Sequence, residues 1–478
     1  MTNLIGRKLE QDVLKRALDS REPELIALVG RRRVGKTFLV RNFFGSEICF
    51  EMTGIHGANR SLQLRNFSDQ LRQAMKLDVK PEVPTDWYAA FQQLIQFLES
   101  RKGKARRVVF LDELPWLASR KSGFLSALEH FWNSWGSRQH NLIVVICGSA
   151  ASWMIDHVIH DRGGLYQRVT RHLHLQPFSL REVAEYLNSR SIRYEPRQIT
   201  ELYMALGGVP HYLREVQPGL SAAQNLDQIC FASQGILVDE YSKLYAALFE
   251  NPDRHVDIIQ ALAKRLSGVT RSELLESLSY LSGGRLTKTL DELMVSGFIE
   301  RIEPWGKQRR DAMYRLIDEF SLFYLKWMKS RRNVGKEAWL NKRGTPAWRA
   351  WTGFAFENIC HRHIQAIKAN LGIAAVETQH ACWQHRAKGD IDVGAQVDLL
   401  IDRRDDVINL CEIKYADDEF VIDQRYAKEL RRKLDVFRRV SGTRKSVQLT
   451  MITTFGVRKN QYATELVDSE VKLSGLFD

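Results

Sequence analysis

The sequence predicts an α/β fold with a parallel sheet in its first third and a second α/β segment at its carboxyl end. Three apolar runs, at residues 24–29, 108–111 and 142–147, have the length and composition of buried strands. Helical patterns lie between these runs, and strands that alternate with helices form parallel sheets because each crossover needs a helix. A further α/β pattern begins near Trp348.

The composition is that of a globular protein with several domains. A chain of 478 residues is long enough for about three domains, and 44% hydrophobic with 27% charged residues is ordinary for soluble proteins. Lysine and arginine number 70 against 57 aspartate and glutamate, a net charge of +13. This balance favours nucleic acid or another polyanion as a partner, although a solvated basic surface has the same composition.

The six cysteines are scattered without a CxxC pair, which indicates a reducing compartment and offers no zinc framework. The amino terminus lacks the apolar region of a signal peptide. No run approaches the ~18 apolar residues that a membrane helix needs. We therefore expect a cytoplasmic protein without a membrane partner.

Changes in pattern divide the chain into four expected segments: 1–177 with the parallel sheet, 178–250 as a helical lid, 251–330 as a winged helix, and 331–478 as the second α/β domain. The winged helix is expected from three helices and a hairpin, with helices at 256–266, from 270 and at 285–295, a turn at 283–284, and hairpin strands at 298–301 and 314–316. The second helix opens at Thr270, whose spacing to Glu273 is that of a capping box.

The loop after the first strand has the complete GxxxxGK[ST] spacing of a Walker A motif. Its residues are Gly30, Arg31, Arg32, Arg33, Val34, Gly35, Lys36 and Thr37. In such a loop, successive backbone N–H groups face phosphates, Lys36 reaches the β- and γ-phosphates, and Thr37 offers its hydroxyl to magnesium. The helix that opens there adds its positive end. Because the motif follows a buried strand and opens a helix, it predicts an ATP site.

The second and third strands end in residues that complete this site. Asp112 and Glu113 follow four apolar residues as in a Walker B motif, so Asp112 is expected to hold magnesium and Glu113 to polarise the attacking water. Ser149 ends the third strand, at the sheet edge where ligands bind, and is expected to sense the γ-phosphate. Either Arg162 or Arg168 could act as an arginine finger on the transition-state charge.

These motifs resemble the archaeal-type ATPase family of the AAA+/STAND group of P-loop proteins. The resemblance extends to the segments LDELPWL, CGS and LYQR, and to Gly207-Gly208-Val209-Pro210 with Tyr212-Leu213. It implies a P-loop sheet, a helical lid, a winged helix and a carboxyl-terminal nuclease-like domain. It also favours Arg168 over Arg162 as the finger, although Gln167 stands where the family usually has glycine.

The carboxyl-terminal segment contains an acid followed by an acid-x-lysine pattern. Asp398 lies in one apolar run, and Glu412 and Lys414 share one face of the next, 14 residues on. A hairpin with a polar turn at 403–406 brings the three together. Carboxylates and a lysine beside a phosphodiester suit magnesium-dependent cleavage.

This layout resembles the PD-(D/E)xK nuclease (restriction-endonuclease-like) fold. In that fold an acid from the preceding helix often joins the site, and Glu357 matches it. The resemblance therefore implies a metal site of Glu357, Asp398 and Glu412, with Gln424 as a weaker candidate. Val397 stands where the family has proline.

Two helices carry cations suited to nucleic acid. The segment after the acid-x-lysine strand holds seven of them, Arg425, Lys428, Arg431, Arg432, Lys433, Arg438 and Arg439, against the acids Glu429 and Asp435. In the expected winged helix, Arg285 and Lys288 open the helix that would read DNA. Both segments are also compatible with plain solvated or packing surfaces.

We therefore expect an ATP-binding and ATP-hydrolysing protein, with ATP and Mg²⁺ as cofactors, that acts on nucleic acid and carries a magnesium-dependent DNA nuclease domain. The alternative is a nucleotide-state signalling switch that binds a protein partner and keeps a degenerate nuclease fold. A homo-oligomer fits the first reading, because arginine fingers often come from a neighbouring subunit.

Overall fold

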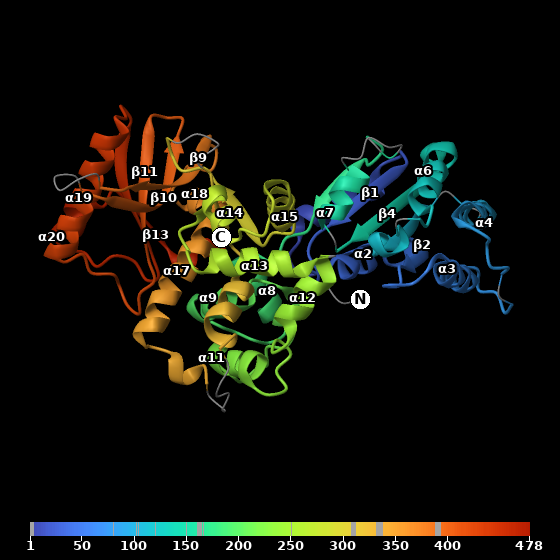
Figure 1. Cartoon of the computed structure of the whole chain (residues 1–478), viewed down its shortest axis with the longest axis horizontal. Helices are drawn as coiled ribbons and strands as arrows, with labels where there is room; N and C mark the ends of the chain where they lie inside the picture. The colour runs from blue at the N-terminus through green and yellow to red at the C-terminus, as the bar shows by residue number, and fades with distance from the viewer. Residues whose placement is uncertain are drawn as a thin grey trace. The chain divides into compact units, whose positions relative to one another are not determined.

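The computed structural model describes residues 4–79, 81–101, 103, 105–119, 121–149, 151–159, 165, 167–249, 251–306, 312–330, 338–387 and 393–478. The chain divides into two compact units, one of residues 1–177 with 246–250 and the other of 178–245 with 251–478 (Figure 1). Among the helices in these ranges, none is long and apolar enough to cross a membrane.

The first unit is built on a five-stranded, fully parallel sheet in the order β2-β3-β4-β1-β5. Its strands are β1 (Glu24–Val29), β2 (Ile48–Thr53), β3 (Arg107–Asp112), β4 (Leu142–Gly148) and β5 (Arg171–His174). The three predicted strands are confirmed as the central strands β1, β3 and β4. The edge strands β2 and β5 are not fully buried, so no continuous apolar run marks them in the sequence.

Helices cover both faces of this sheet. Alternate side chains of β1 point to opposite faces: Ile26 and Leu28 pack with α1 and α2, whereas Leu25 and Ala27 pack with α3, α4 and α6. The helices are α1 (Lys8–Asp19), α2 (Lys36–Phe44), α3 (Arg60–Met75), α4 (Trp87–Ser100), α5 (Leu114–Leu117), α6 (Phe124–Ser134) and α7 (Ala151–Met154). Both faces of the central strands β1 and β4 are therefore buried, which leaves their ends for ligands.

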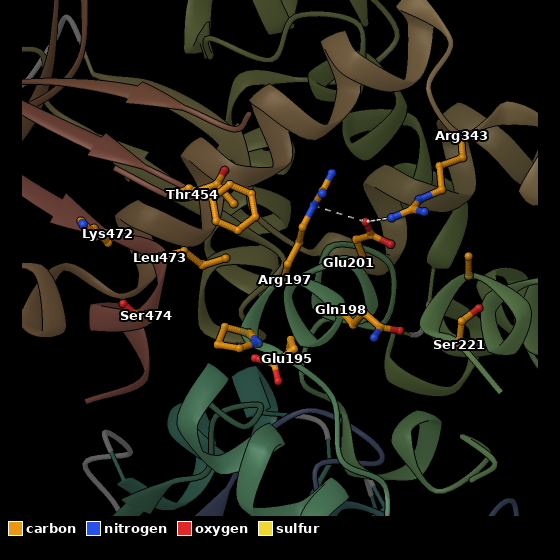
Figure 2. A pocket seen from close by; sticks show the side chains of 13 residues that line it. Glu195, Arg197, Gln198, Glu201, Ser221, Arg343, Thr454, Lys472, Leu473 and Ser474 are labelled. Carbon is orange, nitrogen blue, oxygen red and sulfur yellow. Dashed lines mark hydrogen bonds and ion pairs between the residues drawn. The ribbon is translucent and has the colours of Figure 1, made fainter. Parts of the chain in front are cut away.

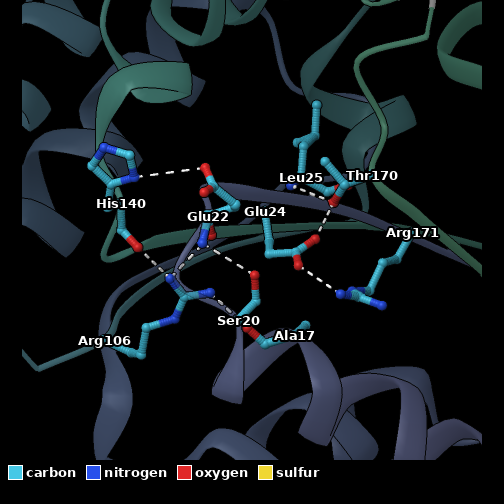
Figure 3. Close-up of polar contacts among 9 residues, drawn as sticks. All are labelled: Ala17, Ser20, Glu22, Glu24, Leu25, Arg106, His140, Thr170 and Arg171. Carbon is cyan, nitrogen blue, oxygen red and sulfur yellow. Dashed lines mark hydrogen bonds and ion pairs between the residues drawn. The ribbon is translucent and has the colours of Figure 1, made fainter.

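Two arginines hold the end of the sheet at which β1 begins (Figure 3). Arg106 donates to the carbonyl oxygens of Ala17, Glu22 and His140 at 2.6, 3.1 and 2.5 Å. The Glu24 carboxylate accepts from Arg171 at 2.7 Å and from the Thr170 hydroxyl. These contacts fix the amino ends of the strands and leave their carboxyl ends for the phosphate loop.

The segment after the first sheet is helical, as its pattern predicts. It contains α8 (Leu180–Ser189), α9 (Pro196–Leu206), α10 (Pro210–Leu213), α11 (Ala222–Leu226) and α12 (Glu240–Leu248). Gly208 in the GGVP segment has φ +66°, and a Cβ there would lie 2.2 Å from the carbonyl oxygen of Phe178. Glycine is therefore required where α9 and α10 join.

Three helices and a small antiparallel sheet of order β6-β8-β7 follow. They are α13 (Pro252–Ala263), β6 (Val269–Thr270), α14 (Arg271–Ser277), α15 (Gly283–Val295), β7 (Ile299–Ile302) and β8 (Met313–Leu316). The predicted turn at Gly283-Gly284 is wrong, because α15 begins there. Ser282 has extended backbone at the N-cap position, and the first turn of a helix tolerates glycine.

The second unit ends in a mixed five-stranded sheet of order β13-β12-β11-β10-β9, with β9, β10 and β11 antiparallel and β11, β12 and β13 parallel. Its strands are β9 (Thr378–His385), β10 (Ala395–Arg403), β11 (Val407–Lys414), β12 (Ser446–Thr453) and β13 (Ser469–Lys472). Its helices are α16 (Glu319–Phe323), α17 (Pro346–Arg362), α18 (Ile364–Asn370), α19 (Gln424–Ser441) and α20 (Gln461–Leu466). The predicted hairpin is confirmed by the antiparallel pairing of β10 and β11, and the apolar face of α19 packs on the sheet.

Candidate ATP site and C-terminal acidic site

The phosphate loop joins β1 to α2. Gly30 has φ +154°, and a Cβ there would lie 2.5 Å from the carbonyl oxygen of Leu175, so the loop can turn only with glycine at this position. Lys36, 6% exposed, donates from Nζ to the carbonyl oxygens of Gly30 and Arg31 at 2.7 and 3.0 Å. These bonds hold its ammonium group against the inside of the loop, at the amino end of α2. A polyphosphate in the loop would meet this charge together with the N–H groups of the helix end.

Arg7 also fixes this loop, although sequence reasoning did not select it. It immediately precedes α1, is 5% exposed, and donates to the carbonyl oxygen of Val34 at 3.1 Å. Its φ of +57° is unusual for a residue other than glycine. The one sequence signal is its place directly after Gly6 at the start of the first helix.

The Walker A and Walker B residues meet as predicted. The Thr37 hydroxyl donates to Asp112 Oδ2 at 2.6 Å, and Asp112 is 4% exposed at the end of β3. A hydroxyl and a carboxylate side by side are hard oxygen donors of the kind Mg²⁺ prefers beside nucleotide phosphates. The pair therefore fits a magnesium ion, which would supply charge neutralisation at the phosphates when bound.

Glu113 and Ser149 also lie together. Ser149, at the end of β4, donates to Glu113 Oε2 from its hydroxyl at 2.8 Å and from its backbone N–H at 3.2 Å. Glu113 has φ +50°, so its side chain leaves the strand end in a defined direction. The sequence did not predict this contact between Ser149 and Glu113.

The remaining predicted residues of the ATP site differ in exposure. Arg31 and Val34 are buried, Arg32 and Arg33 are half-buried, and Arg168 is exposed. The Arg168 backbone N–H donates to the carbonyl oxygen of Leu165 at 2.9 Å. Arg162, the other finger candidate, lies outside the described residues.

A buried thiol lies beneath the site. Cys147 on β4 is fully buried, and burial followed by the nearby Asp112 carboxylate raises its pKa well above the ordinary value. It therefore remains a neutral thiol and packs as a small apolar residue.

In the second unit, the hairpin brings Asp398, Glu412 and Lys414 together as predicted. Asp398 on β10 accepts at Oδ2 from the Ile413 backbone N–H at 3.1 Å, and Lys414 on β11 donates to Glu412 Oε1 at 2.8 Å. Burial, followed by the Glu412 carboxylate, raises the pKa of Asp398 to about 6. Glu412 is 1% exposed; burial alone would raise its pKa, but the ammonium groups of Lys414 and Lys433 lower it.

Glu357 comes from α17, which packs against β11. Burial, followed by the Asp398 carboxylate, raises the pKa of Glu357 to about 8. Gln424, the weaker candidate, is exposed at the first position of α19.

Two further residues of this site come from α19. Lys433 donates to both oxygens of Glu412 at 2.9 and 2.8 Å, and the Tyr426 hydroxyl donates to Glu412 Oε1 at 2.7 Å. The sequence places Lys433 only in the basic run. Its heptad-like spacing with the buried Leu430 and Phe437 was the available sign that it faces the sheet.

The predicted metal ligands Glu357, Asp398 and Glu412 interact electrostatically with one another in this structure. Within the described ranges, no group of three or more His, Cys, Asp or Glu side chains is placed to hold a metal ion. The Glu412 carboxylate accepts hydrogen bonds from Lys414, Lys433 and Tyr426, and it lies close enough to Asp398 to raise the pKa of that residue. A magnesium ion bound to both oxygens of Glu412 would take the place that Lys433 occupies. Asp390 and Asp392 lie outside the described residues.

The second unit also contains a cavity of about 610 Å³ that no sequence motif predicts (Figure 2). It lies at the carboxyl ends of β12 and β13 and the amino end of α9. Glu201 on its wall accepts from Arg343 at 2.7 Å and lies 4.0 Å from Arg197. The arginines at this cavity are therefore neutralised by their own acidic partners.

Comparison with known proteins gives one family match. Residues 4–216 match a family described as an ATPase domain predominantly from Archaea. An uncharacterized protein of Methanocaldococcus jannaschii, MJECL04, is 24% identical over 418 residues, which cover 86% of this chain and 88% of that protein.

Two solved structures are similar at low identity. The Walker-type ATPase PABY2304 of Pyrococcus abyssi has a TM-score of 0.49 at 18% identity, over 68% of this chain and 96% of that one. The ORC2 protein of Aeropyrum pernix, solved in ADPNP–ADP complexes, has a TM-score of 0.43 at 15% identity, over 68% of this chain and 93% of that one. The family match and the assembled Walker residues agree: residues 4–216 carry an archaeal-type ATPase domain, and the chain is an ATPase.

Proposed function

We propose that this ATPase acts on nucleic acid, with ATP hydrolysed in the first unit and DNA bound by the second. The observation that carries the proposal is the outer face of α19. Five of its cations are exposed, namely Arg425, Lys428, Arg432, Arg438 and Arg439.

An open pocket with a volume of about 660 Å³ lies along the same helix. Its charged lining consists of Lys428, Arg431, Arg432, Asp435, Arg438 and Arg439, so cations outnumber the acid five to one. A row of cations along one helix can follow a phosphate backbone, and it gains affinity from the release of counterions. This arrangement favours a nucleic acid over a plain solvated face.

The three helices and hairpin of residues 252–316 support the same proposal. They have the element order of a winged helix, and α15 carries Arg285 and Lys288 exposed in its first turns. The first turns of such a helix are the part that enters a DNA groove. We therefore propose α15 as a second DNA contact.

In the ATP site, each residue has a proposed task. Lys36 holds the β- and γ-phosphates, and Glu113 accepts a proton from the attacking water. Ser149 orients Glu113 through its hydroxyl and N–H. Arg168, exposed at the surface, is available to the phosphates of a neighbouring copy, which would make hydrolysis depend on a homo-oligomer.

The test is the salt dependence of binding to a fluorescent DNA duplex, followed by anisotropy. Contact with about five phosphates gives a slope of about −4.5 for log K against log salt concentration. The double variant Lys428→Ala/Arg432→Ala should reduce this slope by about 2. Lys8→Ala/Lys15→Ala removes the same charge from exposed positions of α1 and should leave the slope unchanged. Equal slopes for all three proteins would contradict the proposal.

A magnesium-dependent nuclease in the second unit is a competing candidate, favoured by the acid and acid-x-lysine on adjoining strands. It requires that a cation displace Lys433 from Glu412. A cleavage assay on duplex and single-stranded DNA tests it, with Glu412→Ala as the comparison. Identical DNA after incubation with either protein would exclude it. The neutralised Glu412 favours a third candidate, a nucleotide-state switch with a degenerate nuclease fold, which would show no salt-dependent DNA binding.

A further inference from the structure

Lys433 and Glu412 form a buried ion pair that no motif of the chain accounts for. Lys433 is 9% exposed and Glu412 is 1% exposed. The Lys433 ammonium contacts both carboxylate oxygens, at 2.9 and 2.8 Å. A cation placed across both oxygens occupies the position that a bidentate metal ion would take.

The rest of the Glu412 carboxylate is also engaged. Oε1 accepts from Lys414 at 2.8 Å and from the Tyr426 hydroxyl at 2.7 Å, in addition to Lys433. Oε1 accepts three of the four hydrogen bonds from these three side chains, and Oε2 accepts one, from Lys433. A metal ion that bound both oxygens of Glu412 would have to displace Lys433.

Charge balance leads to the same conclusion. The carboxylates of Asp398 and Glu412 are matched by the ammonium groups of Lys414 and Lys433. A divalent cation in the same place would face two ammonium groups at short range. Mg²⁺ also gives up its water reluctantly and demands near-octahedral oxygen ligands, which this arrangement does not offer.

The position of Lys433 is fixed by its helix. Leu430, Leu434 and Phe437 on the same face of α19 are packed in the core against the sheet. Withdrawal of the ammonium group would leave the buried Glu412 with one cation fewer, and an uncompensated buried charge is costly.

We propose that Lys433 is the resident counter-ion of Glu412 and closes the acidic site to divalent cations. The second unit then works without a metal ion in this site. This statement concerns cation binding only and holds whether or not the unit binds DNA.

The experiment counts Mn²⁺ ions bound to the full-length chain, from the electron paramagnetic resonance signal of free Mn²⁺. The protein carries Asp112→Asn and no nucleotide, so that the ATP site contributes no ion. In this background the otherwise unchanged chain should bind no ion that Glu412→Gln removes. Adding Lys433→Met should create one bound ion per chain, and Glu412→Gln should remove it again. Lys459→Met, at an exposed position of the same unit, is the matched control and should create none.

Two results would overturn the proposal. One is a Glu412-dependent ion in the chain that retains Lys433, because the site would then be open. The other is a folded Lys433→Met protein that binds no such ion, because something other than Lys433 would exclude the metal. Thermal melting checks the fold of each variant. If Lys433→Met does not fold, Lys433→Gln replaces it, and the comparison of Lys433-containing chains with and without Glu412→Gln still decides whether the site is open.

Discussion

Lys36 has almost no freedom within the phosphate loop. Its ammonium group is buried and lies on the carbonyl oxygens of Gly30 and Arg31, so its position is set before any ligand arrives. A charge fixed in advance where negative charge develops needs no reorganisation during the reaction.

Lys36→Ala should therefore reduce ATP turnover by at least about 100-fold, because loss of one preorganised donor to a transition-state charge has this effect. The fold should remain, since the methyl group fits where the lysine stem lay. A coupled assay of phosphate release measures the turnover, and thermal melting measures the fold. Lys15→Ala, exposed on α1, is the control. Turnover that survives in Lys36→Ala would place the ATP site elsewhere.

The burial of Glu357 predicts how the stability of the protein depends on pH. Its pKa is raised from 4.5 to about 8 by burial and then by Asp398, so the folded state keeps a proton that the unfolded chain releases. The folded state accordingly loses stability as the pH rises from 4.5 to 8. Glu357→Gln stays neutral and should melt higher than the unaltered chain at pH 8, with little difference at pH 4. Glu377→Gln, at an exposed ion pair, should show no such trend, and a falling melting temperature of Glu357→Gln at pH 8 would contradict the assignment.

For individual residues, the sequence predicts those site residues that belong to one motif. It does not predict the contacts made by residues from other helices or strands. Asp398, Glu412 and Lys414 are found because strand periodicity places them on one hairpin. The sequence singles out Lys433 and Ser149, but it does not predict that Lys433 contacts Glu412 or that Ser149 contacts Glu113. Those contacts depend on how a helix or a strand end packs. No regular sequence spacing identifies two side chains that meet from different helices or strands.

Among the helices and strands, α14 shows that a local sequence motif can correctly predict where a helix begins. The predicted capping box is present: Thr270 accepts from the Glu273 N–H, and the Glu273 carboxylate accepts from the Thr270 N–H. By contrast, β2 and β5 were missed because edge strands are half-exposed. The central strands are buried on both faces, and this is what makes them visible as apolar runs.

The capping box makes a second pH prediction. The hydrogen bond from the Thr270 backbone, with help from Arg265, lowers the pKa of Glu273 to about 2. Its contribution to stability is therefore complete above pH 4.5 and is lost as the pH falls toward 2. Glu273→Gln should lower the melting temperature at pH 7, and the difference should shrink as the pH drops below 4.5. Glu276→Gln, exposed on the same helix, should have no effect, and a difference that does not change with pH would rule out the carboxylate as its cause.

For the whole molecule, the basic composition indicates nucleic acid as a class of partner, but it does not show which surface would bind it. The net charge of +13 belongs to both units together, whereas the structure shows five exposed cations on one face of α19. The basic run was visible in the sequence. Which of its members face solvent and which, like Lys433, face the sheet depends on how the helix packs.

The central claim is that this chain both hydrolyses ATP and binds nucleic acid, and that the two activities are coupled. The most direct measurement is the steady-state rate of phosphate release at saturating ATP, with duplex DNA added to the concentration that saturates binding. We predict that DNA raises this rate and that the increase disappears at salt concentrations that abolish binding. A rate that stays the same from zero to saturating DNA at low salt would contradict the claim.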